Sequence, residues 1–324
     1  MKVDFVARAS VFFLSLAAVF GTTGALAQSF PDKVVRMVVP FPPGGGADGP
    51  ARVVAEKMST ILGQPVIVDN KPGASANIGA EFVARAPADG YTLLFTNEVL
   101  SSNQSMFRAL RYDSVKDFVP VAKIGNAAVA MAVHPGVQAK SLAELVAVSK
   151  DKEINYASPG VGTGPHLFAE LLVIATGAKF NHIPYKGAGP ATTDAVGGQV
   201  DMIITALAPL APHVANGKLR ALAVTGSARS GLMREIPTVA ESGVTAFTYD
   251  LWYALVAPAG VPAPVLAKLQ QAAATALQDR DVVQRLRTMG IEPDGSPPSA
   301  LPKQISDGIE RWNRVIREAN ISRE

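Results

Sequence analysis

The sequence predicts an α/β protein built from two lobes, and three observations lead to that fold class. Short β-rich runs alternate with helical patterns over most of the chain, which is typical of sheets covered by helices. A chain of 324 residues is large for a single hydrophobic core. A last strand-like run at 249–257 is followed by three helical segments, so we expect the chain to return to its first lobe.

The expected elements follow one another as strand and helix. The β-rich runs are 34–39, 66–69, 92–96, 119–124, 130–134, 154–157, 179–183, 200–204, 219–224 and 249–257. The helical patterns are 47–62, 77–86, 142–149, 166–176, 190–197, 210–216, 264–277, 281–289 and 302–319. Ser141 is expected to cap a helix with Glu144 at the capping-box position, and Gly177 to end one. Such alternation predicts parallel sheets.

This order of elements divides the chain into domains. We expect residues 28–131 and 253–324 to form lobe one, and residues 132–252 to form lobe two. The two crossings between the lobes would act as a hinge, and ligands favour the cleft between lobes.

The first 27 residues predict export. Lys2 and Arg8 make a basic start, 11–20 is an apolar core too short to span a bilayer, and Ala25-Leu26-Ala27 is a small-x-small cleavage site. We therefore expect residues 1–27 to be a removable signal peptide and the mature protein to be exported. A buried first helix is the alternative interpretation.

Composition excludes several classes of function. There is no cysteine, which removes disulfides and thiolate metal sites, and the four histidines lack the short spacing of a helical zinc motif. The formal net charge is +3, or +2 without the signal segment. That mild balance argues against nucleic acid, which would require clustered lysine and arginine. We expect no metal and no cofactor.

A glycine-rich turn at 44–49 is the first candidate site. It follows a strand and precedes a helix, so its backbone N–H groups would meet an anion at the positive end of the helix dipole. The letters also satisfy the dinucleotide fingerprint G-x-G-x-x-G, with Asp69 at the spacing of a ribose-binding acid. The stiffening residues Pro40, Pro42 and Pro43, together with export, favour a smaller anion over a nucleotide.

A second glycine-rich turn at 158–166 also lies between a strand and a helix, so the two turns would face each other across the cleft. Ser158 is not in a nucleophile elbow, because position 156 is Tyr, and no spacing supports a triad of Ser158, His166 and Asp194. Asn97, Glu98 and Ser101 follow a strand at the end where α/β sheets bind ligands. Trp252 and Tyr253 are interpreted as packing at the return crossing.

Taken together, these motifs resemble the solute receptors of tripartite tricarboxylate transporters, the Bug family. The resemblance covers nearly the whole chain after the signal segment. It is carried by Pro40–Gly45 with Asp48 and Arg52, and by Gly63–Val66, Asn70–Gly73, Ala88–Thr92, Asp117-Phe118, Tyr156–Gly162, His182–Gly187, Gly217–Val224, Pro237–Gly243 and Trp252-Tyr253.

The resemblance implies a two-lobed, type II periplasmic-binding-protein fold of the Venus-flytrap kind, with a hinge and an interlobe cleft. It implies a monomeric, non-catalytic receptor that captures a small organic carboxylate and delivers it to the membrane subunits of the transporter. The ligand-binding positions that it implies are Phe41, Gly44, Gly45, Gly46, Asp48, Asn97, Ser158, Gly160, Gly162, Thr163, Asp194, Thr205 and Ala206.

The chain departs from the family pattern in two places. Gly46 and Ala47 stand where the family often has hydroxyl residues, and Glu98 adds a carboxylate near a carboxylate site. Glu98 either selects a ligand with a hydroxyl or cationic group or points to solvent. A receptor that feeds a signalling system and an exported α/β hydrolase are the alternative functions.

Overall fold

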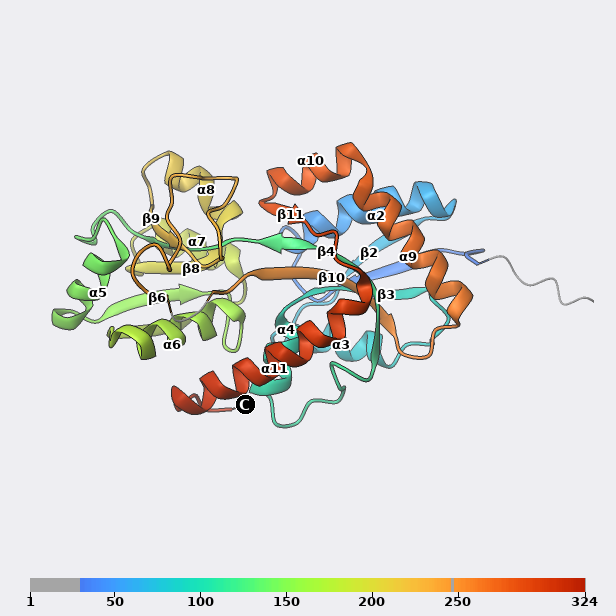
Figure 1. The fold of residues 1–324 in the computed structure, drawn as a ribbon, viewed down its shortest axis with the longest axis horizontal. Coiled ribbons are helices and arrows are strands. Elements are labelled where there is room, and N and C mark those ends of the chain that lie inside the picture. The colour runs from blue at the N-terminus through green and yellow to red at the C-terminus, as the bar shows by residue number, and fades with distance from the viewer. Residues whose placement is uncertain (1–29, 246–247, 324) are drawn as a thin grey trace, which may run out of the picture. The chain divides into compact units, whose positions relative to one another are not determined.

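The computed structural model describes residues 30–245 and 248–323, so the expected signal peptide at 1–27 lies outside the described residues. From Lys33 onward the chain forms one compact unit that contains two sheets (Figure 1). One sheet has the strand order β11 (Ile291–Pro293), β4 (Phe118–Ala127), β10 (Leu251–Pro258), β3 (Thr92–Asn97), β1 (Val35–Val39) and β2 (Val66–Asn70). The other has the order β7 (Phe180–Pro184), β6 (Ile154–Ser158), β8 (Met202–Ala206), β5 (Val129–Val133) and β9 (Arg220–Val224).

Helices cover both sheets. With the six-stranded sheet, α2 (Asp48–Leu62), α3 (Asn77–Ala84), α4 (Val99–Met106), α9 (Ala263–Gln278) and α10 (Arg280–Thr288) make up what we call the first lobe. With the five-stranded sheet, α5 (Leu142–Asp151), α6 (Gly164–Thr176), α7 (Ala188–Val196) and α8 (Leu207–Ala215) make up the second lobe. After the short 3₁₀ turn η1 (Pro298–Ala300), α11 (Leu301–Glu318) packs against α4 of the first lobe and α6 of the second.

Both sheets are mixed, which corrects the expectation of parallel sheets. Strands β1, β2 and β3 of the first sheet run parallel to one another, as do β6, β7 and β8 of the second. Strand β10 instead enters the first sheet antiparallel to both β3 and β4, and β5 lies antiparallel to β8 and β9 in the second. The reason is that β10 and β5 arrive directly from the other lobe and not over a crossover helix.

The pairing of strands also places the two crossings. The chain leaves the first sheet after Ala127 and enters the second at Val129, and it returns to the first sheet at Leu251. The expected boundaries at 131/132 and 252/253 therefore cut through strands: residues 129–131 pair in the second sheet and residues 251–252 in the first. Hydrophobic periodicity marks a strand but does not mark which sheet it joins. That these crossings act as a hinge stays a prediction.

Two elements were not expected. Helix α4 was not among the expected helices, and its sequence is rich in serine and asparagine, which are weak helix formers. Its polar side chains Ser101, Ser102, Asn103 and Ser105 are nonetheless buried, so tertiary contacts hold the helix. Strand β11 lies between predicted helices and has only three residues.

The expected caps are confirmed: Ser141 Oγ accepts a hydrogen bond from the Glu144 N–H, and Gly177 ends α6 in the left-handed conformation.

Each sheet carries its own buried core. Val38, Leu94 and Val256 contribute to the first, and Ala132, Ile203 and Val224 to the second. Within the described part of the chain, no helix is both long enough and apolar enough to cross a membrane.

The pairing of β11 with β4 depends on Gly125. A Cβ at this position would overlap the Glu292 carbonyl group and would lie 2.8 Å from Ile291 Cγ2. Overpacking of this kind costs about 1–3 kcal/mol, so we expect Gly125→Ala to lower the free energy of unfolding by that amount in urea titrations. A Cβ added at Gly231 would meet no atom within 4 Å, so Gly231→Ala should change stability by less than about 0.5 kcal/mol. Equal losses in both variants would contradict this account.

Candidate functional site

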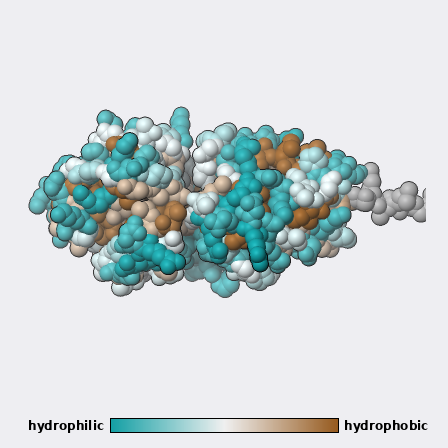
Figure 2. Space-filling model, turned by 90° about the horizontal axis from the view of Figure 1, so that it is seen from above, coloured by the Kyte–Doolittle hydropathy of each residue, from teal (hydrophilic) through white to brown (hydrophobic). Residues whose placement is uncertain are grey.

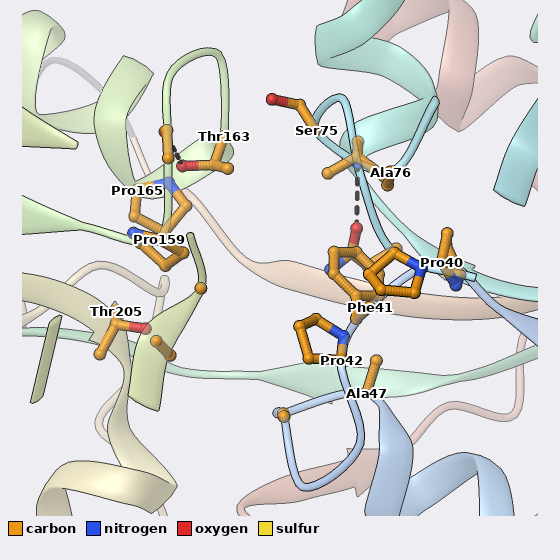
Figure 3. Close-up of a pocket in the computed structure, with 18 of the residues that line it drawn as sticks. Pro40, Phe41, Pro42, Ala47, Ser75, Ala76, Pro159, Thr163, Pro165 and Thr205 are labelled. Atoms are coloured by element: carbon orange, nitrogen blue, oxygen red, sulfur yellow. Dashed lines mark hydrogen bonds between the residues drawn. The ribbon is translucent and has the colours of Figure 1, made fainter. Parts of the chain in front are cut away.

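A cavity of about 720 Å³ lies between the lobes and is lined by both of them. The space-filling view shows an indentation of the surface between the two lobes (Figure 2). The first lobe contributes residues 40–42, 45–47, 72–76 and 97–99, and the second contributes 159–161, 163, 165, 184–188, 205–206 and 209. In the close-up these two groups stand opposite each other across an open space (Figure 3). Leu251 and Tyr253 of β10 complete the lining.

Six helices begin at this cavity. Their N-cap residues, which all line it, are Ala47 of α2, Ala76 of α3, Glu98 of α4, Thr163 of α6, Gly187 of α7 and Ala206 of α8. None of the six caps its own helix with a side-chain hydrogen bond. A helix N-terminus carries about half a positive charge together with unpaired N–H groups. The cavity is therefore a site for anions, with three N-termini on each wall.

The first glycine loop runs from the end of β1 to α2. Two of its N–H groups are used inside the loop: the Gly45 N–H donates to the Pro42 carbonyl oxygen and the Gly44 N–H to Asp48 Oδ2, at 3.1 and 3.0 Å. The N–H groups of Gly46 and Ala47 have no acceptor among the described residues, and both residues line the cavity. Of the predicted positions, Phe41, Gly45 and Gly46 line the cavity, whereas Gly44 and Asp48 do not.

Asp48 holds this loop in place from behind. The side chain is only 5% exposed and accepts hydrogen bonds from Arg52 Nε and Asn70 Nδ2, in addition to the Gly44 N–H. Asn70 Nδ2 also donates to the Phe41 carbonyl oxygen. Burial alone would raise the pKa of Asp48, but these hydrogen bonds hold it below its usual value. Asp48 is thus an ionised brace for the loop.

The second glycine loop runs from β6 to α6 and is braced in the same manner. The Gly160 N–H donates to Ser158 Oγ, the Gly162 N–H donates to His166 Nδ1, and the Thr163 hydroxyl donates to the Gly160 carbonyl oxygen. Gly160 and Thr163 line the cavity, whereas Ser158 and Gly162 lie behind it. Gly162 has φ +73°, and a Cβ there would lie 2.8 Å from Met106 Cγ, so glycine is required. The Val161 N–H has no acceptor in the described part of the chain.

Ser158 is a structural residue. Its hydroxyl is fully buried and lies 2.6 Å from His182 Nε2, whose ring stacks on that of His166. Burial lowers the pKa of His182 to about 4 and, with His182 beside it, that of His166 to about 3, so both rings are neutral. The arrangement gives no substrate access to the hydroxyl, and Asp194 instead accepts a hydrogen bond from the Tyr185 hydroxyl at 2.7 Å. The triad considered from the sequence does not form.

The remaining predicted positions supply neutral polar groups. Asn97 lines the cavity and its Oδ1 accepts from the Val99 N–H, which leaves its amide N–H₂ without an acceptor among the described residues. Thr205 and Ala206 end β8 at the cavity wall, and Figure 3 shows the Thr205 hydroxyl directed toward the open space. Asp194 does not line the cavity. It accepts a hydrogen bond from the hydroxyl of Tyr185, and Tyr185 lines the cavity.

Sequence reasoning missed part of the lining. Residues 72–76 form a third loop, in which Ala74, Ser75 and Ala76 all have positive φ, and the Ser75 hydroxyl crosses to donate to the Val161 carbonyl oxygen of the second lobe. The signal was available, because this loop also leads from a strand end to a helix N-terminus. Tyr253 was interpreted only as packing. The charged residues among the lining are Glu98 and Lys186.

The brace at Asp48 can be tested by its removal. Asp48→Ala removes the carboxylate that accepts hydrogen bonds from the Gly44 N–H, Arg52 Nε and Asn70 Nδ2, and hydrogen bonds to a charged group contribute about 1.5–3 kcal/mol. We expect the free energy of unfolding, measured by urea titration, to fall by that amount. Asp307→Ala removes only an exposed ion pair with Lys303, so it should cost under about 1 kcal/mol. A loss at Asp48 no larger than at Asp307 would show that the brace is not structural.

Known proteins of the same architecture can now be compared with this chain. The family model of the "Tripartite tricarboxylate transporter family receptor" matches residues 50–321. The protein BugT of Bordetella pertussis is 36% identical over 314 residues, which cover 94% of this chain and 96% of BugT.

Solved structures agree with the family. One described as a periplasmic transporter has a TM-score of 0.86 and 38% identity, over 91% of this chain and 100% of that one. An R. palustris protein with adipate has a TM-score of 0.85 and 32% identity, over 90% of this chain and 99% of that protein. MatC from Rhodopseudomonas palustris, with bound malate, has a TM-score of 0.82 and 31% identity, over 89% of this chain and 100% of MatC.

These matches confirm the expected type II periplasmic-binding-protein fold and the expectation of a receptor in place of an enzyme. The two mixed sheets, the cavity between them and the match over most of the chain all lead to one assignment: the chain belongs to the solute-binding receptor family of the tripartite tricarboxylate transporters.

Proposed function

We propose that this receptor binds a small organic dicarboxylate between its lobes and delivers it to the membrane subunits of a tripartite transporter. The observation that carries the proposal is the convergence of six helix N-termini on one cavity, three from each lobe. Two walls of that kind suit a ligand with an anionic group at each end. Adipate and malate, which are bound by two related proteins, have that form.

Backbone and neutral side chains would bind the ligand. The unpaired N–H groups of Gly46, Ala47 and Val161 are donors on opposite walls, and the Asn97 amide and the Thr205 hydroxyl add two more. Hydrogen bonds to a carboxylate are about twice as strong as those between neutral groups. Lys186 is the one lysine or arginine of the described cavity lining, and it is exposed, so a bidentate arginine clamp on phosphate is absent there. This donor set favours carboxylates over phosphates and nucleotides.

The site residues that we propose are the predicted positions that line the cavity, together with those that brace them. Phe41, Gly45, Gly46, Asn97, Gly160, Thr163, Thr205 and Ala206 would face the ligand, whereas Gly44, Asp48, Ser158, Gly162 and Asp194 would hold the loops. The compartment would be the periplasm, reached through a signal peptide at 1–27 that is removed on export. The receptor would act as a monomer.

A thermal-shift screen tests the ligand class. Purified receptor is heated with monocarboxylates, dicarboxylates including malate and adipate, tricarboxylates, amino acids and a nucleotide. A ligand at 100 times its Kd should stabilise the folded state by about 2.7 kcal/mol. We expect the largest shift from a dicarboxylate and none from the nucleotide. A panel in which no carboxylate raises the melting temperature would contradict the proposal.

The first glycine loop can be tested with one substitution. Gly46 lines the cavity, and its Cβ position lies 3.5 Å from the Tyr253 hydroxyl, so the methyl groups of valine would enter the space for the ligand. We expect Gly46→Val to raise the Kd of the best dicarboxylate at least tenfold by calorimetry, which corresponds to about 1.4 kcal/mol. Gly231→Val, at an open position outside the cavity, is the matched control. Unchanged affinity in Gly46→Val would remove this loop from the binding site.

A further inference from the structure

Glu98 joins the two lobes at the base of the cavity. It is the N-cap residue of α4 in the first lobe, yet its Oε1 accepts a hydrogen bond from the N–H of Gly164, the first residue of α6 in the second lobe, at 3.1 Å. The residue lines the cavity and is only 3% exposed. The N-terminus of α6, one of the six at the cavity, is thus occupied by a carboxyl group of the protein, which comes from the first lobe.

The carboxyl group is buried without a positive partner. Its Oε2 has no hydrogen-bond partner among the described residues, and no lysine, arginine or histidine of that part of the chain forms an ion pair with it. The N–H of Gly164, the nearby Tyr249 hydroxyl and the helix dipole favour the charged form of this group. Removal of a carboxylate from water costs more than these neutral contacts return. The neutral acid is therefore the form that suits this position.

The titratable groups around Glu98 do not change that conclusion. Tyr249 lies between the lobes with its hydroxyl against Gly164, and Tyr253 comes from β10. Burial raises the pKa of both tyrosines, and Glu98 raises it further, so they stay uncharged. Burial raises the pKa of Asp250, beside Tyr249, and the nearby charges of Lys123 and Arg311 offset part of that rise. On α6, His166 is neutral and accepts from the Gly162 N–H.

Burial raises the pKa of Glu98 from an ordinary 4.5 to about 7, although the Tyr249 hydroxyl and the Gly164 N–H offset part of the rise. If the lobes separate, the Gly164 N–H moves away with the second lobe, water reaches the carboxyl group, and its pKa returns toward the ordinary value. Closing the cleft on an anionic ligand also brings like charges together, unless Glu98 is protonated.

We propose that Glu98 makes ligand binding by this receptor proton-linked: the cleft closes on its carboxylate ligand with Glu98 as a neutral acid, so the complex takes up one proton from solution. The proton comes from water at the open cleft and ends on the Glu98 carboxyl group. This inference rests on the proposed function, because it requires a carboxylate that closes the cleft.

The sign of the pH dependence follows from the two states of Glu98. Below about pH 4.5 the group is neutral in both the open and the closed receptor, so it has no effect on affinity. Between about 4.5 and 7 only the closed receptor holds the proton, and affinity falls by up to about tenfold per pH unit as the pH rises. Above about pH 7 both states are ionised, and the affinity levels off at its lowest value.

The test compares Glu98→Gln with the parent chain. Glutamine keeps an acceptor for the Gly164 N–H but does not titrate. Binding of malate and of adipate is measured by calorimetry between about pH 5.5 and 8.5, in two buffers of different ionisation enthalpy. We expect the Kd of the parent chain to rise about 30-fold over this range, with uptake of nearly one proton near pH 6. Glu98→Gln should bind with a Kd that does not rise and with no proton uptake.

Glu170→Gln is the matched control. Glu170 is another glutamate whose pKa is raised by burial, and it is partly buried. It lies within the second lobe, where its carboxylate accepts a hydrogen bond from the Tyr156 hydroxyl. Closure does not change its surroundings, so this variant should keep the full pH slope of the parent chain. A slope lost in Glu170→Gln, or kept in Glu98→Gln, would overturn the assignment to Glu98.

A second measurement follows the proton directly. In the receptor labelled with ¹³C at the glutamate carboxyl groups, the resonance missing from Glu98→Gln should titrate near pH 4.5 without ligand, where the cleft is open, and near pH 7 with malate or adipate bound. Equal midpoints in the two states would overturn the proposal. The outcomes separate the two proposals. Binding that is independent of pH would contradict the linkage and leave the function standing. Failure of both carboxylates to bind at any pH would contradict the function, and the linkage with it.

Discussion

The binding site depends on one constraint, the common direction of six strands. The parallel strands β1, β2 and β3 of the first sheet, and β6, β7 and β8 of the second, all end on the side of their sheet that faces the other lobe. Each of these strands passes through a short loop into a helix, so three N-termini with unpaired N–H groups collect on each wall of one cavity. Because backbone dipoles cannot be removed by substitution, the anion site is a property of the fold. The side chains are then left to decide which anion fits.

The loops that carry these N–H groups are held by bonds that do not face the cavity. Asp48 braces the first loop, and the pair of Ser158 and His182 braces the second. Asp48 and Ser158 are buried, so the donors Gly46, Ala47 and Val161 are held in place before a ligand arrives. Such preorganisation reduces the entropy lost on binding, which matters for a ligand with few atoms.

Two hydrogen bonds between the lobes differ in kind. Ser75 donates a neutral hydrogen bond to the Val161 carbonyl oxygen, whereas Glu98 brings an ionisable group to the N-terminus of α6. A neutral contact of this kind contributes similarly at every pH, and a buried carboxyl group does not. Glu98 is therefore the contact between the lobes that would make closure respond to pH.

Features that depend on neighbours along the chain could be predicted from the amino-acid sequence. The two glycine loops between strand and helix, the helix caps at Ser141 and Gly177, and the family itself were readable because turn chemistry, capping and motifs are local. Which backbone N–H groups stay without an acceptor followed only from the folded structure. The Gly45 N–H donates to the Pro42 carbonyl oxygen and the Gly162 N–H to His166 Nδ1, so neither can bind a ligand. The folded structure also decided that polar helix α4 is buried, that β5 and β10 run antiparallel to their neighbours, and that Glu98 meets Gly164 sixty-six residues away. These features arise from packing between distant segments, and no pattern within one segment encodes which distant partner it meets.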